Sequence, residues 1–121
     1  MFEIRQRRDA DGALRLTLIG ELDIAVADGL RDELDRLRRS HRRVRLDLSE
    51  LAFIDCYGVG GIVRALREAR RDDWDLEVDA KVSPSVGRVA AHDEIASALW
   101  PGVGGHPPHD EAPRGFVVSA V

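Results

Sequence analysis

Val44–Gly58, with the sequence VRLDLSELAFIDCYG, is the stretch that decides the fold class of this 121-residue chain. Apolar and charged side chains alternate over its first five residues, which is typical of a β-strand with one buried face. Beyond Gly58 the apolar residues return at helical spacing, at Val59, Ile62, Val63 and Leu66. The stretch therefore predicts a strand that passes into a helix, with the change at Asp55–Gly58.

The chain before this stretch shows the same two patterns. Alternating apolar residues over 2–18 predict a β-hairpin, with its turn at Asp9–Gly12 and with Gly20 at the end of the strand pattern. Asp23 is the expected N-cap of a helix, because its carboxylate can accept hydrogen bonds from the first helical turn. The apolar face of that helix is formed by Ala27, Leu30, Leu34 and Leu37.

The chain after this stretch adds one more strand and two short helices. Residues 74–79 alternate again and predict the strand, Ser83-Pro84 is typical of a helix start, and Trp100-Pro101 ends the last helix. Strands that alternate with helices predict an α/β domain with a mostly parallel sheet. Because the strands are not continuously apolar, we expect the helices chiefly on one face of that sheet.

Length and charge limit what kind of protein this can be. The 121 residues suit one domain, and 18 basic against 22 acidic residues give a net charge of −4. That charge argues against nucleic acid or an anionic membrane as a partner.

A single cysteine excludes an internal disulfide, and the sequence has no apolar run suited to a signal peptide or a membrane span. We expect a cytoplasmic domain.

Composition also divides the chain. Residues 101–115 hold four of the five prolines. We therefore expect a domain over residues 1–100 and a Pro/Gly/His-rich extension over 101–121, in which Phe116–Val118 could add an edge strand. His106, His109 and Asp110 make a poor metal site, because no fourth ligand lies nearby in the sequence.

Cys56 is the position of greatest chemical interest. It stands where a helix begins, and there the helix dipole favours a thiolate or a bound phosphoryl group. The alternative, which the residue type favours, is a small buried hydrophobic side chain. Catalysis by the thiol is not expected. Ile62 stands where a phosphatase loop needs an arginine, and no second cysteine or nearby histidine is present.

Two further features have ordinary explanations. The glycines of Gly58–Gly61 lack the spacing of a phosphate-binding loop, so we interpret them as packing residues. The arginines between Arg36 and Arg45 are typical of a solvated helix end. The sequence therefore indicates no enzyme, no cofactor and no metal.

Three segments together resemble the STAS domain of bacterial anti-sigma-factor antagonists. They are Leu16–Asp23 (LTLIGELD), Val44–Gly58 and Val82–Val89 (VSPSVGRV), in consistent order across residues 2–100. The resemblance implies a STAS-like mixed sheet with helices packed chiefly on one face. It also implies a regulatory module in the bacterial cytoplasm that binds an anti-sigma factor or serine-kinase-like protein by partner switching.

In that family a kinase phosphorylates a serine or threonine directly after the loop aspartate, and the added charge breaks the complex. The phospho-acceptor-equivalent position here is Cys56, followed by Tyr57, so the resemblance implies no phosphorylation of the usual kind. We favour a constitutive binder. A redox switch at Cys56 and a scaffold in another signalling complex are the alternatives.

The residues expected to bind the partner lie in two loops that each lead from a strand to a helix. Such loops open at the same edge of an α/β sheet. The predicted partner-binding residues are Glu21, Asp23, Asp55, Cys56, Tyr57 and Gly58. The sequence leaves the identity of the partner and the oligomeric state open.

Overall fold

Residues 1–101 are the part of the chain that the computed structural model describes, and they form five strands and four helices. In chain order the elements are β1 (Phe2–Arg8), β2 (Leu14–Leu22), α1 (Ile24–Arg39), β3 (Val44–Leu48), β4 (Leu51–Ile54), α2 (Cys56–Arg71), β5 (Leu76–Val82), α3 (Pro84–Val89) and α4 (Asp93–Leu99). Apart from Pro101, the predicted extension lies outside the described residues, and so does the strand considered for Phe116–Val118.

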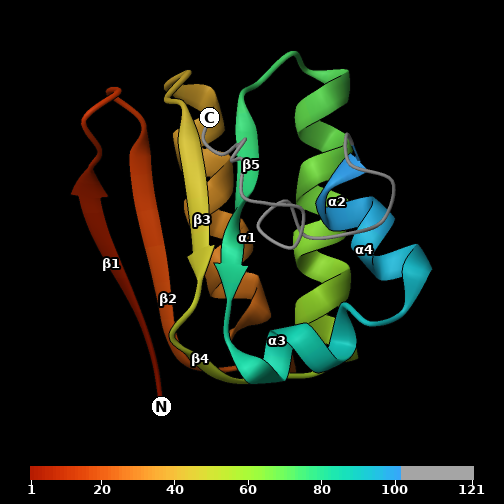
Figure 1. Cartoon of the computed structure of the whole chain (residues 1–121). Coiled ribbons are helices and arrows are strands. Elements are labelled where there is room, and N and C mark those ends of the chain that lie inside the picture. Colours follow the sequence, from red (N-terminus) through yellow and green to blue (C-terminus); the bar gives the residue numbers. More distant parts are fainter. Residues whose placement is uncertain (102–121) are drawn as a thin grey trace.

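The sheet has the strand order β1-β2-β3-β5, and β4 pairs with the end of β2 (Figure 1). β1 and β2 form an antiparallel hairpin, whereas β3 and β4 each pair with β2 in parallel, as β5 does with β3. Helices α1 and α2 contact each other. In Figure 1, α1 lies behind β3 and β5, and α2 stands to the right of β5. The predicted fold class, a mostly parallel mixed sheet with helices chiefly on one face, is confirmed.

The core lies between the sheet and these two helices. Leu16, Leu18 and Leu46 of the strands are fully buried, because every second side chain of a strand turns to the same face. The residues that α1 and α2 bury are Leu30, Leu34, Leu37, Gly58, Ile62, Leu66 and Ala69. Helical spacing thus predicted the buried leucines of both helices and Ile62 correctly. The predicted Ala27, Val59 and Val63 are only half-buried, and the spacing did not predict Gly58 and Ala69.

Strand β2 continues through Gly20, so the prediction that the strand pattern ends there was wrong. Gly20 has a φ of 98°, and between Gly20 and Glu21 the pairing with β4 passes over Ala52, so the extra residue of this β-bulge lies on β4. A Cβ on Gly20 would stand 2.1 Å from the carbonyl oxygen of Met1. Glycine therefore allows the backbone of Met1 to approach β2 closely while β2 continues to Leu22.

Strand β2 has two successive partners on one side. Residues Leu14–Thr17 pair with β3, and residues Gly20–Leu22 pair with β4. The sequence indicated only an apolar patch at Leu51–Ile54, where the structure has β4. Its outer residues are buried and its middle two are exposed, so the alternation that marks the other strands is absent.

The end of the described chain covers the free edge of β5. Trp100 is buried, and its indole Nε1 donates a hydrogen bond of 3.1 Å to the carbonyl oxygen of Val78. The indole thus supplies a hydrogen bond to a carbonyl group of an edge strand. Trp74, which the sequence placed at the start of this strand, instead precedes β5 and donates to the carbonyl oxygen of Arg42.

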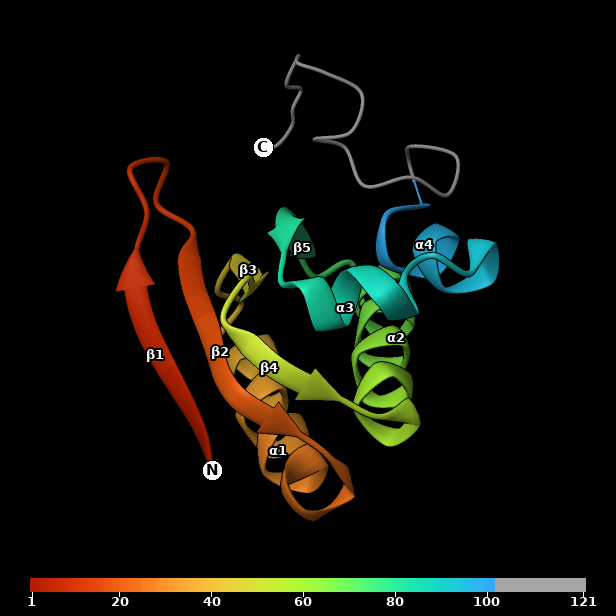
Figure 2. The ribbon, with the colours of Figure 1, turned by 60° about the horizontal axis from the view of Figure 1, so that its bottom comes forward.

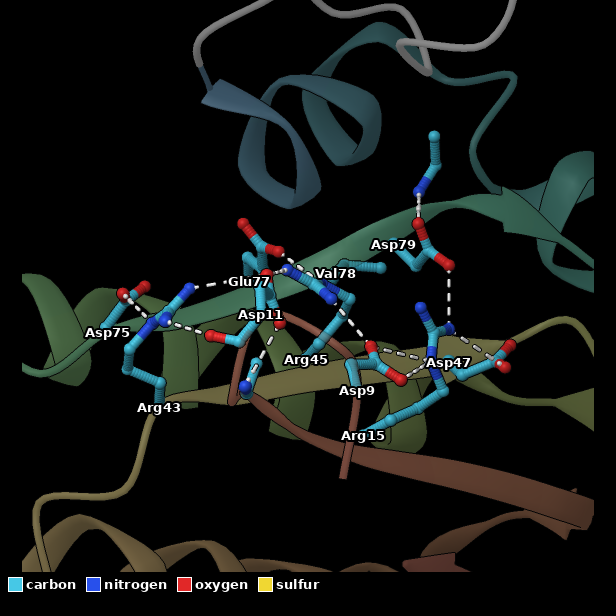
Figure 3. A network of polar contacts seen from close by, with 12 residues as sticks. Asp9, Asp11, Arg15, Arg43, Arg45, Asp47, Asp75, Glu77, Val78 and Asp79 are labelled. Carbon is cyan, nitrogen blue, oxygen red and sulfur yellow. Dashed lines mark hydrogen bonds and ion pairs between the residues drawn. The ribbon is translucent and has the colours of Figure 1, made fainter. Parts of the chain in front are cut away.

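The face of the sheet opposite the helices carries a network of ion pairs centred on Arg15 of β2 and Arg45 of β3 (Figure 3). The carboxylates that accept hydrogen bonds from these two guanidiniums are Asp9, Asp11, Asp47, Glu77 and Asp79. The Arg45 side chain is only 7% exposed. Because Asp9 and Asp11 belong to the β1–β2 turn, the network connects this turn to β2 and β3 on the face of the sheet that lies opposite the helices.

Candidate protein-binding surface

The strands β2 and β4 end side by side, and the loops that follow them lead into α1 and α2. Leu22 pairs with Ile54 at these ends, and the backbone N–H of Asp55 donates to the carbonyl oxygen of Leu22 at 3.2 Å. Figure 2 brings this end of the molecule forward. The two segments predicted to bind a partner, 21–25 and 55–58, are therefore neighbours in space.

Asp23 and Asp55 cap the two helices. The Asp23 carboxylate accepts a hydrogen bond from the backbone N–H of Ala25 at 3.0 Å, and Asp55 accepts one from Gly58 at 2.9 Å. Each carboxylate thus satisfies a first-turn N–H and lies near the positive end of a helix dipole. The N-cap predicted at Asp23 is confirmed, and a contact of either aspartate with a partner stays a prediction.

Gly58 is buried beneath this surface. A Cβ at this position would stand 2.7 Å from the carbonyl oxygen of Leu22 and 2.9 Å from the Cγ of the same leucine. No side chain fits there without a shift of the backbone, so glycine allows the first turn of α2 to lie against the end of β2.

Cys56 and Tyr57 are the first two residues of α2, and both are exposed. The expectation that Cys56 is a small buried hydrophobic side chain was therefore wrong. The first residue that α2 buries is Gly58, so the core does not need a side chain from position 56. The residue type alone could not show this, because cysteine is buried more often than not.

Two exposed apolar residues beside these loops were not predicted. Ile24 and Phe53, like Tyr57, have between 49% and 59% of their surface exposed. Ile24 directly follows the cap Asp23, and Phe53 is the strand neighbour of Glu21. Ile24 could have been found, because it lies off the apolar face of its helix. Phe53 could not, because it stands in a run of four apolar residues.

The exposed large hydrophobic residues of the described part of the chain gather at this end of the sheet: Met1, Ile24, Phe53 and Tyr57. Met1 belongs to the group because its carbonyl oxygen accepts a hydrogen bond from the backbone N–H of Glu21 at 2.9 Å. Contiguous exposed apolar surface is uncommon on a monomer and is typical of a contact with another protein. We call these four residues the apolar patch.

Two grooves meet at the start of α2. The α1–α2 groove, of about 380 Å³, lies between those helices, and the α2–α4 groove, of about 590 Å³, lies between α2 and the segment from α3 to α4. Cys56 and Gly60 line both grooves. The start of α2 is therefore a ridge with a hollow on either side, next to the apolar patch.

Residues 1–101 contain no group of three or more side chains that could hold a metal ion. The same residues contain no helix with the length and apolar character that crossing a membrane requires. His106, His109 and Asp110 lie outside the described residues.

Residues 6–91 match the family model described as "Mlab, STAS domain". The match covers more than half of the chain, so this chain belongs to the STAS domain family. The resemblance that three segments of the sequence indicated is confirmed at the level of the family.

Solved structures share the fold. The chain is similar to an anti-sigma factor antagonist from Mycobacterium paratuberculosis, with 17% identity over 75% of this chain and 76% of that one, and a TM-score of 0.63. It is also similar to the antagonist SpoIIAA in its unphosphorylated form, with 19% identity, coverage of 72% and 80%, and a TM-score of 0.57. At these identities the similarity establishes the fold.

A third similar structure, that of Mglu, is 30% identical over 61% of this chain, with a TM-score of 0.53. The matched region spans only 18% of the Mglu chain, so the likeness concerns one part of a longer protein. Among curated proteins no match is found.

Proposed function

We propose that this STAS domain is a regulatory module that binds another protein at the apolar patch and the two capped helix starts beside it. The observation that carries the proposal is the gathering of Ile24, Phe53 and Tyr57 at one end of the sheet. Water contact with these side chains is unfavourable, and a partner that covers them gains binding free energy from their burial. The function is binding, without catalysis and without a cofactor.

We infer that the partner is an anti-sigma factor of the serine-kinase-like type, in the bacterial cytoplasm, and that the chain works in transcription regulation. The shared fold with two anti-sigma factor antagonists supports this inference. Glu21, Asp23, Asp55, Cys56, Tyr57 and Gly58 make up the proposed contact region together with Ile24 and Phe53. Gly58 is buried beneath the contact region and contributes to it by allowing α2 to pack closely against β2.

Cys56 makes the proposed complex constitutive. It occupies the position directly after the loop aspartate, and a serine kinase acts on hydroxyl groups rather than thiols. The regulation by phosphorylation that the family resemblance implies therefore has no acceptor at this position. The partner then stays bound until another process, such as its own turnover, ends the complex.

A second function, a scaffold or redox-responsive domain in another signalling complex, is supported by two observations. The matching family model is described as an Mlab STAS domain rather than as an antagonist. Cys56 is also exposed, which an oxidant would require. This function uses the same surface but a different partner, and the same experiment distinguishes the two.

The experiment is affinity capture from a lysate of the source bacterium with Mg-ATP present, followed by calorimetry with each retained protein after purification. We expect wild type to retain an ATP-binding, kinase-like protein. Tyr57→Asp and Cys56→Asp should weaken its binding at least about tenfold, because each places a charge in an apolar contact. Ser97→Asp, on the exposed surface of α4 and outside both grooves, is the matched control.

Three outcomes are informative. Loss of a kinase-like protein with Tyr57→Asp supports the antagonist function. Loss of a protein of another class supports the scaffold function. Binding that Tyr57→Asp and Ser97→Asp leave equally unchanged would show that the apolar patch is not the contact surface.

A further inference from the structure

The α1–α2 groove has an apolar floor and runs along both helices away from the apolar patch. Leu22, Leu30, Leu34 and Ala65 line it, and Trp74 stands among the residues of its wall. Along α2 it extends from Cys56 to Glu68. At 1.5 Å per helical residue that distance is about 18 Å, which corresponds to about three turns of a helix.

Two glycines in this groove are not packing residues, so the interpretation of Gly58–Gly61 as packing residues was wrong for them. Gly60 and Gly61 lie inside α2, and a Cβ at either position would meet no atom within 4 Å. Neither has the positive φ that favours glycine, in contrast to Gly20. Glycine is among the least favourable residues inside a helix. These positions therefore weaken α2 and leave its surface bare where it faces the groove.

The rim of the groove carries unpaired charges of both signs. Asp28 and Arg31 on α1, and Arg64 and Glu68 on α2, line the groove. None of the four has an ion-pair partner within residues 1–101. The α1 residues on this rim follow one another at helical steps of three and four: Asp28, Arg31, Asp35 and Arg38. An occupant that is apolar along one side and carries both charges along its flanks would complement this rim.

We propose that the α1–α2 groove receives an amphipathic helix of the partner protein, about three turns long. Its apolar stripe lies on the leucine floor, its charged flanks pair with Arg31, Arg64 and the acidic residues of the rim, and its backbone approaches α2 closely over Gly60 and Gly61. The proposal rests on the proposed function, because it names the part of that partner which extends contact beyond the apolar patch.

The walls of the groove favour a helix over an extended segment. An extended peptide needs unpaired backbone groups alongside it, as at the edge of a sheet. Both walls here are helices, whose backbone N–H and C=O groups are paired within the helix except at its ends. A helix satisfies its own backbone groups and presents only side chains to such a groove.

The test uses the whole chain and two displayed libraries of 18-residue peptides with the same composition. In one library the apolar residues recur at i, i+3, i+4 and i+7, and in the other they alternate with polar residues. We expect selection to enrich the helical library, and the enriched peptides to gain helical circular dichroism on binding. Enrichment of the alternating library, or of neither, would overturn the proposal.

Gly61→Leu supplies the site-specific part of the test, because position 61 lines only the α1–α2 groove and a leucine there would fill it. The matched control is Gly29→Leu, at an exposed position of α1 that is open in the same way and lies outside the groove. We expect Gly61→Leu to weaken peptide binding at least tenfold, with a melting temperature equal to or above that of wild type. Equal affinity of both variants would overturn the proposal.

The same variants separate this proposal from the proposed function. If Tyr57→Asp releases the captured partner and Gly61→Leu does not, the partner binds the apolar patch but places no helix in the groove. If Gly61→Leu releases it and a selected peptide displaces it from wild type, the proposal holds. If neither variant affects the captured protein, both proposals fail.

Discussion

At the scale of single residues, the glycines at the start of α2 have opposite effects on the fold although they stand within four positions of one another. Gly58 is required, because the carbonyl oxygen of Leu22 would lie 2.7 Å from a Cβ. Gly60 and Gly61 are surrounded by open space. One short sequence motif therefore combines a residue that the fold demands with two residues at which the fold would accept a side chain.

Gly58→Ala and Gly60→Ala should change stability in opposite directions. We expect Gly58→Ala to lower the free energy of unfolding by about 2 kcal/mol, because the added methyl group must displace backbone atoms. Gly60→Ala should raise it by up to about 1 kcal/mol, because alanine is the better helix former. Urea unfolding of the two variants beside wild type measures both effects. Equal losses in the two variants would contradict the steric distinction.

At the scale of elements, the β1–β2 turn is connected to the sheet by ion pairs of Asp9 and Asp11. Burial raises the pKa of Asp9, but hydrogen bonds from Arg15 and Arg45 outweigh it and leave that pKa below its ordinary value. The hydrogen bond from Arg45 is the main cause that lowers the pKa of Asp11 to about 2. Burial raises the pKa of Asp47 as well. Hydrogen bonds from Ser49 and the positive charge of Arg15 outweigh this effect, so the pKa of Asp47 lies below its ordinary value.

These carboxylates make the stability of the domain depend on pH. A carboxylate whose pKa is lower in the folded state adds stability above its unfolded pKa, and this stability is lost as the pH falls through the folded pKa. For Asp11 the window runs from an ordinary value of 3.8 down to about 2. We therefore expect the free energy of unfolding to decrease from pH 4 towards pH 2.

Arg45→Met tests the network directly. At pH 7 the variant should lose about 2 kcal/mol of stability, because Asp9 in particular keeps its charge in a largely buried position with one partner fewer. Its stability should then fall less steeply than that of wild type between pH 4 and pH 2. Arg70→Met, at an exposed position of α2, is the control. Parallel pH profiles of Arg45→Met and wild type would show that the network does not cause the dependence.

At the scale of the whole molecule, the last buried side chain of the described residues belongs to Trp100. Its indole donates a hydrogen bond to the carbonyl oxygen of Val78 in β5. We propose residues 1–100 as the folding unit on this ground.

Trp100→Ala should lower the free energy of unfolding by about 3 kcal/mol, because it leaves a cavity and an unpaired carbonyl oxygen at Val78. Trp100→Phe retains most of the buried volume and should lose about 1 kcal/mol, which corresponds to the hydrogen bond. Thermal and urea unfolding of both variants measure the difference. A negligible effect of Trp100→Ala would show that the fold is complete before this residue.

Sequence patterns predicted those parts of the molecule that depend on local geometry. Alternation in β2 and β3 identified the buried leucines, and the type and position of Asp23 identified a helix cap. The path of β2 through Gly20 could not be predicted, because it depends on contact with Met1, which is far along the hairpin. The exposure of Phe53 depends likewise on which strand and helix lie beside β4. Tertiary contacts decide these features.

The pairing of β2 with three neighbours has a consequence for how this domain can change in evolution. β2 is paired with β1 along one side and with β3 and then β4 along the other, so three neighbours share one strand. Deletion of a single residue between Ala13 and Gly20 would shift the register of β2 by one residue on one side of the deletion, and the core leucines there would turn to the open face of the sheet. Insertions and deletions that natural selection retains should therefore fall in the turns and at the helix ends, while the length of β2 stays constant.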